Sequence, residues 1–362
     1  MTVSAATLRN FAFARSLGIK TNLQQAICAL GFVQADPIRA PARAQDLILM
    51  QRVHRYRAGD LELHYPSLDV EEDMIHNYGF MPRTVQLLLH PREAEMLQIP
   101  HDVPDLSVRV LQFVHEQGPV HPRDLATHFG RATMGNYWGG TSNATTRILD
   151  RLHFCGKLRI VGRDKGTRIY GVADHLAPPE GNLSRTEQAH GLVQLLLNLY
   201  APLPVQSLGY LVSLIGYGAP HLKAELRTAL KNIEAQRAKI DTLTYLWPDG
   251  EAPDGAAPCK VRLLTPFDPL VWDRRRFAHL HGWTYKFEAY TPALKRQFGY
   301  YALPLLWGAN AVGWANLKIE GSELKADIGF VNGQPKSKAF AREMEAELSR
   351  YKTFLLGSSH NP

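Results

Sequence analysis

The chain has 362 residues, 45% of them hydrophobic, and a formal net charge of +7. This length allows two to four small domains, and the basic charge favours a phosphate-bearing partner over a cationic one, although on charge alone nucleic acid is only an even choice. Three widely spaced cysteines without CxxC spacing argue against a disulfide framework and a structural zinc site, and no run of about 20 apolar residues could cross a membrane.

Residues 1–100 are expected to form a mainly helical, winged-helix-like domain, because apolar residues recur at helical spacing over 8–15 and 23–30. Its most specific feature is the segment Val33-Gln34-Ala35-Asp36-Pro37. Pro37 disfavours helical geometry at Asp36, and in an extended segment Gln34 and Asp36 project to the same side. An alternative interpretation makes Asp36 the N-cap of a helix with Pro37 at its first position.

Residues 101–180 show the element order of a winged helix-turn-helix domain. Helices are predicted over 108–116, 122–129 and 143–154, followed by a hairpin over 157–170. The third helix has a polar face suited to a DNA groove. The hairpin tip carries Arg163, Lys165 and Arg168, which either bind phosphates or are simply solvated charges.

Residues 181–257 repeat this order, with predicted helices over 192–200, 204–214 and 222–240 and a last segment over 242–247. Aromatic residues and short apolar runs then predict a small β-barrel-like domain within 258–362, closed by an amphipathic helix over 337–356. The predicted fold class is therefore α+β: tandem winged helix-turn-helix domains, a small β-barrel-like domain and a C-terminal helix.

Several stretches are specific enough to compare with known families. One is the Gln34-Ala35-Asp36 segment with its continuation over 42–47, and another is the run Tyr137-Trp138-Gly139-Gly140. The most specific stretches lie within 266–276, 288–290 and 295–308. Together they resemble the winged-helix crosslink-repair DNA glycosylases of the YcaQ (AlkX) type. The resemblance spans nearly the whole chain, and Asp36 places it with the subgroup whose signature is Gln-x-Asp.

This resemblance implies a monofunctional DNA glycosylase that hydrolyses the N-glycosidic bond of N7-alkylated guanine and that could unhook interstrand crosslinks. Double-stranded DNA would be its partner, with no cofactor and no metal. Gln34 and Asp36 would be catalytic. The alkylated base already carries a positive charge, so a carboxylate that stabilises the sugar cation and deprotonates a water would suffice. Gln34 would hold that water or the lesion.

Other residues are candidates for support and DNA contact. His76 either orients the site or is a hydrogen-bonded structural residue. Tyr137 and Trp138 either stack on a nucleotide or belong to a core. The full set of predicted DNA-binding residues is Arg39, Arg43, Tyr137, Trp138, Arg163, Lys165, Arg168, Lys295, Arg296 and Lys318.

Two other functions stay open at this point. A winged-helix transcription regulator without catalysis would use the same helices, usually as a dimer on a palindromic site. A repair scaffold without catalysis is the third alternative. His115, His121 and His128 lack matching carboxylates or cysteines, so we expect no metal site. The cysteine usage and the lack of a targeting segment predict a location in the cytoplasm, away from membranes, and we expect a monomer.

Overall fold

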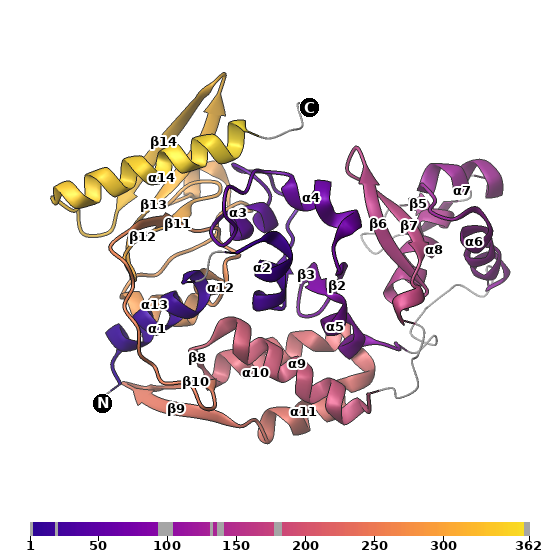
Figure 1. Cartoon of the computed structure of the whole chain (residues 1–362), viewed down its shortest axis with the longest axis horizontal. Coiled ribbons are helices and arrows are strands. Elements are labelled where there is room, and N and C mark those ends of the chain that lie inside the picture. The colour runs from indigo at the N-terminus through magenta and orange to yellow at the C-terminus, as the bar shows by residue number, and fades with distance from the viewer. Residues whose placement is uncertain are drawn as a thin grey trace.

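The computed structural model describes residues 3–18, 21–92, 104–130, 133–135, 141–176 and 183–357. It combines helices with small antiparallel sheets. Elements from the N-terminal quarter lie at the centre, and later parts of the chain surround them on three sides (Figure 1). Within the described part, none of the helices combines the length and apolarity that a bilayer crossing demands.

The central unit is built around a three-stranded antiparallel sheet of order β1-β3-β2. Its elements are α2 (Leu23–Leu30), β1 (Val33–Gln34), α3 (Ala44–Met50), α4 (Asp60–His64), β2 (Val70–Met74), β3 (Tyr78–Pro82) and α5 (Arg83–Gln86). In the register of β1 and β3, Gln34 lies opposite Gly79. A Cβ on Gly79 would collide with the Val33 carbonyl and the Phe32 ring, so glycine permits the close approach of β1.

The next unit contains the helices α6 (Pro104–Gln117), α7 (Pro122–Phe129) and α8 (Ala144–Phe154), then the hairpin strands β6 (Leu158–Asp164) and β7 (Thr167–Val172). Figure 1 shows the hairpin between these helices and the central unit. A short strand pair that the sequence reasoning did not predict, β4 (Thr133–Gly135) with β5 (Thr141–Asn143), precedes α8. Tyr137 and Trp138 lie outside the described residues.

The third unit contains α9 (Arg185–Tyr200), α10 (Val205–Gly218), α11 (Lys223–Lys231) and a sheet of β8 (Leu203–Pro204), β10 (Leu243–Pro248) and β9 (Ala235–Ile240) in that order. The prediction of one helix over 222–240 was wrong in its second half. The helix ends at Lys231, and 235–240 is a strand paired with β10 through a tight turn. Asp241 adopts a φ of 51° in that turn, a conformation that Asp tolerates.

The C-terminal unit has a four-stranded antiparallel sheet of order β11-β12-β13-β14. The elements are β11 (Val261–Leu263), α12 (Pro269–Trp272), α13 (Arg274–His281), β12 (Leu303–Trp307), β13 (Asn310–Glu320), β14 (Glu323–Phe330) and α14 (Lys338–Leu356). The expected barrel is not closed, since β11 and β14 are edge strands in the described sheet. Four strands are too few to close around a core, and α14 covers the sheet instead, with Phe340 against Trp307 and Phe330 (Figure 1).

A buried ion pair joins the first and last units. Arg52, just after α3, donates from Nη1 to Asp268 Oδ2 at 2.8 Å and from Nη2 to Oδ1 at 3.1 Å. Both side chains are almost fully buried. Arg52 also donates to the carbonyls of Ser16 and Ile48, and Asp268 caps α12 by accepting from the Leu270 amide. The pair therefore fixes the end of α1 (Ala5–Leu17), α3 and α12 together.

We expect Arg52→Met to lower the free energy of unfolding by about 3–5 kcal/mol, because it leaves the Asp268 charge buried without its partner. Chemical denaturation measures this loss. Adding Asp268→Leu should restore much of it, since the unpaired charge is then gone. Lys325→Met, which breaks the exposed pair with Glu323, is the control and should cost less than about 1 kcal/mol. A similar loss for both single variants would contradict the expectation.

Candidate active site

The Gln-x-Asp segment leaves the central sheet as an extended strand. The Ala35 amide donates to the Tyr78 carbonyl at 2.9 Å, which continues the pairing of β1 with β3. The Gln34 side chain is buried, and its Oε1 has no hydrogen-bond partner among the described residues. A buried amide oxygen without a partner is costly, so a ligand or a water is the natural donor to it.

Asp36 is half-buried and faces the start of the following loop. Its Oδ1 accepts a 2.9 Å hydrogen bond from the Ile38 amide, a local Asx turn. The interpretation of Asp36 as a helix N-cap is wrong, because no helix follows Pro37 and the next one begins at Ala44. Burial raises the pKa of Asp36, and the bond from Ile38 only partly offsets that rise.

Two side chains from other elements reach the Asp36 segment. Gln45, at the start of α3, accepts a 3.4 Å hydrogen bond from the Asp36 amide through its Oε1. Tyr301, from the C-terminal unit, is buried and hydrogen-bonded to the Thr265 hydroxyl at 2.9 Å. Burial raises the pKa of Tyr301 first, and the negative charge of Asp36 raises it further, so the phenol lies near this carboxylate.

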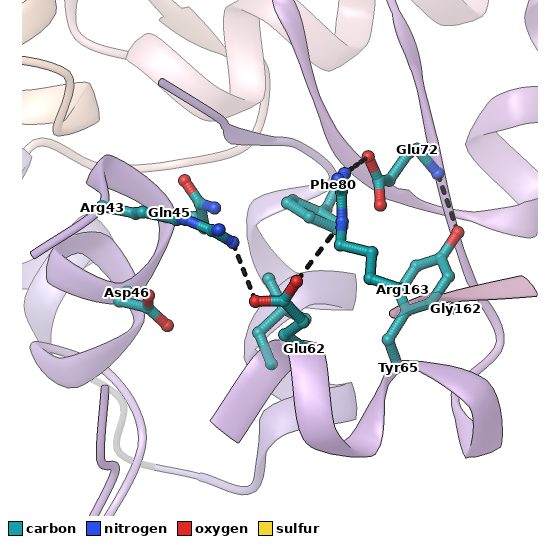
Figure 2. Close-up of a pocket in the computed structure, with 10 residues that line it drawn as sticks. Arg43, Gln45, Asp46, Glu62, Tyr65, Glu72, Phe80, Gly162 and Arg163 are labelled. Atoms are coloured by element: carbon teal, nitrogen blue, oxygen red, sulfur yellow. Dashed lines mark hydrogen bonds and ion pairs between the residues drawn. The ribbon is translucent and has the colours of Figure 1, made fainter. Parts of the chain in front are cut away.

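Two hollows are lined by residues close to this segment. A cleft, drawn in Figure 2, is lined by Arg43, Gln45, Asp46, Leu61, Glu62, Tyr65, Glu72, Phe80, Gly162 and Arg163. A larger hollow, of about 580 Å³, is lined by Ala40, Gly299, Tyr300, Tyr301, Asn316, Leu317, Lys318, Lys325, Ala326 and Asp327. Gln45 belongs to the first hollow, and Ala40 and Tyr301 belong to the second. Residues next to the Gln-x-Asp segment thus line the junctions of the central unit with the β6–β7 hairpin and with the C-terminal unit.

An alternating chain of charges crosses the cleft (Figure 2). Arg43 Nη1 lies 2.8 Å from Glu62 Oε2, and Arg163 Nε lies 3.7 Å from Glu62 Oε1. Arg163 also pairs with the buried Glu72. This series of ion pairs holds the hairpin β6–β7 against α4.

His76 occupies an aromatic cluster behind the sheet. Its Nε2 is 2.8 Å from the Tyr200 hydroxyl, and its ring contacts Phe32 and Trp272. Burial lowers the pKa of His76 to about 3, so the ring is neutral at physiological pH. Phe32 directly precedes β1, so His76 packs next to the start of the strand that carries Gln34. A role in supporting the site therefore stays a prediction, acting through packing and not through charge.

Comparison with known proteins decides the family. The model of the family described as "DNA glycosylase AlkZ-like" matches residues 27–354, which include both Gln34 and Asp36. The chain belongs to the AlkZ-like DNA glycosylase family. It is therefore a DNA glycosylase, a DNA-repair enzyme, and the family resemblance seen in its sequence is confirmed. Membership in an enzyme family also favours catalysis over a transcription regulator.

The fold of the glycosylase is similar to that of a solved structure, the DNA glycosylase AlkZ of Streptomyces sahachiroi. The two share 14% sequence identity with a TM-score of 0.65, over 100% of this chain and 99% of that one. At this identity the likeness concerns the fold. Among the residues that the structure describes, no group of three or more His, Cys, Asp or Glu side chains is arranged to hold a metal ion.

The predicted DNA-binding residues of the hairpin have unequal surroundings in the glycosylase. Arg163 is tied to Glu72 and Glu62, as described above. Arg168 pairs with Asp150 at 3.2 Å and lies over the Tyr78 ring at 4.7 Å. Lys165 is exposed at the turn with a φ of 48°. Replacing Arg163 and Arg168 would therefore test the packing of the hairpin as much as DNA binding, and Lys165 is the cleaner probe.

The remaining predicted DNA-binding residues lie nearer the large hollow. Lys318 lines it, is 70% exposed and pairs with Glu320 at 2.5 Å. Arg296 donates to the Thr291 carbonyl at 2.8 Å and lies over the Tyr300 ring, and the neighbouring Lys295 is exposed. Arg39 is exposed on the loop that follows Asp36. Arg43 faces Glu62 in the cleft, so its charge is already matched.

Sequence reasoning missed Asp46, although it is the most perturbed carboxyl in the cleft. The Tyr56 hydroxyl donates to its Oδ1 at 2.6 Å and the Gly59 amide at 3.2 Å, yet burial dominates and raises the pKa of Asp46 to about 6. One signal was available: an acidic residue within the apolar run of α3, all of whose residues are buried.

We expect Asp46→Asn to stabilise the glycosylase at pH 8 but not at pH 4. The folded-state pKa lies above the ordinary 3.8, so the native state holds this proton more tightly and wild-type stability falls as pH rises from about 4 to 6. Asparagine keeps the acceptor oxygen without the charge. At pH 8 the free energy of unfolding of Asp46→Asn should exceed that of the wild type by about 2 kcal/mol. Denaturation at both pH values measures it, and an equal difference at the two would contradict it.

Proposed function

We propose that this glycosylase hydrolyses the N-glycosidic bond of N7-alkylated guanine in double-stranded DNA, with Asp36 and Gln34 as its catalytic pair. The observation that carries the proposal is their juxtaposition at the end of β1. Gln34 offers a buried amide oxygen without a partner among the residues that the structure describes, and Asp36 offers a half-buried carboxyl with a raised pKa. Ala40, on the loop that follows Asp36, and Tyr301 line a hollow large enough for a nucleotide.

The chemistry asks little of the protein beyond these two groups. An N7-alkylated guanine carries a positive charge and leaves the sugar as a neutral base, so it needs no strong acid. The ionised Asp36 carboxylate stabilises the cationic sugar as the C–N bond breaks and takes a proton from the attacking water. Gln34 holds that water or the lesion, because its amide group both donates and accepts hydrogen bonds.

Duplex DNA would lie across the central and C-terminal units and the hairpin β6–β7 in this proposal. Arg39, Lys165, Lys295 and Lys318 carry exposed cationic groups suited to phosphates. The hollow beside Asp36 encloses about 580 Å³ and is open to solvent, so it accepts bulky adducts. We therefore include crosslinked guanines, whose unhooking would use the same reaction, among the proposed substrates.

We expect Asp36→Asn to slow excision of N7-methylguanine by about two to four powers of ten, because it removes the charge but keeps the acceptor for the Ile38 amide. Gln34→Ala should slow excision by a smaller factor. Single-turnover excision, read as alkali-labile sites, measures both. The wild-type rate should rise with pH around a midpoint above the ordinary carboxyl value of 3.8, since burial raises the pKa of Asp36.

The control for this prediction is Asp241→Asn, on the exposed turn between β9 and β10. It should leave both the rate and the melting temperature near those of the wild type, and Asp36→Asn should keep its melting temperature and DNA affinity. If Asp36→Asn excises N7-methylguanine at the wild-type rate, the catalytic assignment of Asp36 is wrong.

We also expect DNA affinity to fall steeply with salt and to depend little on sequence. Each phosphate contact adds about 0.9 to the slope of log affinity against log salt, because bound counterions are released. Lys318→Ala should therefore lower the slope by about 0.9, and Lys352→Ala, at an exposed site on α14, should not. Titration of a labelled duplex at several salt concentrations tests this. If Lys318→Ala leaves the slope unchanged, Lys318 does not contact a phosphate.

A further inference from the structure

One loop of the C-terminal unit presents apolar side chains to solvent. The loop joins α13 to β12, and within it Leu294 is 102% exposed and Tyr290 is 83% exposed. Tyr300, near the end of the loop, is 43% exposed. Single exposed apolar residues are ordinary. Leu294, however, exposes its whole side chain and lies in a loop with two exposed tyrosines. This grouping is a stronger indication that a binding partner covers the loop.

The loop is held in a defined shape. Leu294 lies in the single 3₁₀ turn Ala293–Lys295, closed by a 2.8 Å bond from the Lys295 amide to the Pro292 carbonyl. At the base of the loop, the buried Glu288 carboxylate accepts from the Gln297 amide at 2.9 Å and from the Phe298 amide at 2.7 Å. Leu294 is thus projected from a pinned turn and does not depend on a flexible tether for its position.

The surroundings of the turn match nucleic acid. Lys295 follows Leu294 directly and is exposed, and the guanidinium of Arg296 lies 5.0 Å from the centre of the Tyr300 ring. Tyr300 in turn lines the large hollow together with Lys318. The apolar tip is therefore bordered by cations that could hold a phosphate backbone on either side of it.

The turn also lies on the side of the molecule that carries the proposed chemistry. The hollow that Tyr300 lines is bordered by Ala40, which belongs to the same loop as Asp36. It is bordered as well by Tyr301, whose phenol lies near the Asp36 carboxylate. The hollow therefore connects Tyr300, which follows Leu294 by six residues and contacts the guanidinium of Arg296, to the loop that carries Asp36.

We propose that Leu294 is a wedge that enters the base stack of duplex DNA beside the damaged nucleotide and opens it toward Asp36. The proposal rests on the proposed function, since it deepens the account of how that site meets its substrate. A glycosidic bond within a stacked duplex is shielded, and proteins commonly separate stacked bases with an apolar side chain. Burial of the leucine between bases offsets part of the cost of unstacking.

The test compares Leu294→Ala with Leu356→Ala, which removes a leucine exposed on α14. The substrates are a duplex with one N7-methylguanine and the same strand without its complement. Leu294→Ala should slow single-turnover excision from the duplex about tenfold or more and from the single strand less than about twofold, because only the duplex must be opened. Leu294→Phe should keep most of the duplex rate. Leu356→Ala should change neither.

A second measurement is independent of excision. A 2-aminopurine next to the lesion should brighten when Asp36→Asn protein binds the duplex, and adding Leu294→Ala should abolish that rise. The wedge is wrong if the rise persists without Leu294, or if excision from duplex and single strand falls equally. If the wild type excises nothing but the Leu294-dependent rise remains, the proposed function fails and the wedge stands.

Discussion

Three consecutive carboxylates on β2 organise this molecule. Glu71, Glu72 and Asp73 are each at most 1% exposed, although β2 is an edge strand of its sheet. Cations from elsewhere in the chain match each of them. Arg159 binds Glu71 at 2.7 Å, Arg163 binds Glu72, and Arg92 binds Asp73 at 2.9 Å. Buried unpaired carboxylates would be very unfavourable, so the hairpin β6–β7 can pack on the central sheet only in this arrangement.

Much of the site could be predicted from local chemistry. Pro37 keeps Asp36 out of a helix, and the segment before it is extended as expected, although its pairing in a sheet was not predicted. The run of acids on β2 could not be predicted, because its burial depends on arginines far away in the sequence. For the same reason both interpretations of the hairpin tip, phosphate binding and solvated charge, left out the engagement of Arg163 by carboxylates inside the protein.

The fold shows the same division between local and distant information. Helices with strong apolar periodicity, such as α9 and α14, were predicted because their burial pattern repeats within a few residues. The open four-stranded sheet was read as a barrel, since strand sequences do not reveal whether the edge strands meet. Closure is decided by what covers the sheet, here a helix that follows in the chain.

The walls of the large hollow have consequences for how the enzyme is made. Ala40 is synthesised early, whereas Tyr301 and Lys318 come from the last part of the chain. A nascent chain on the ribosome therefore carries Gln34 and Asp36 long before the hollow beside them exists. Arg52 likewise has no carboxylate partner until Asp268 has been translated, so the central unit lacks this buried ion pair for most of synthesis. A chain that ends before residue 301 would thus carry Gln34 and Asp36 without the far wall of the hollow.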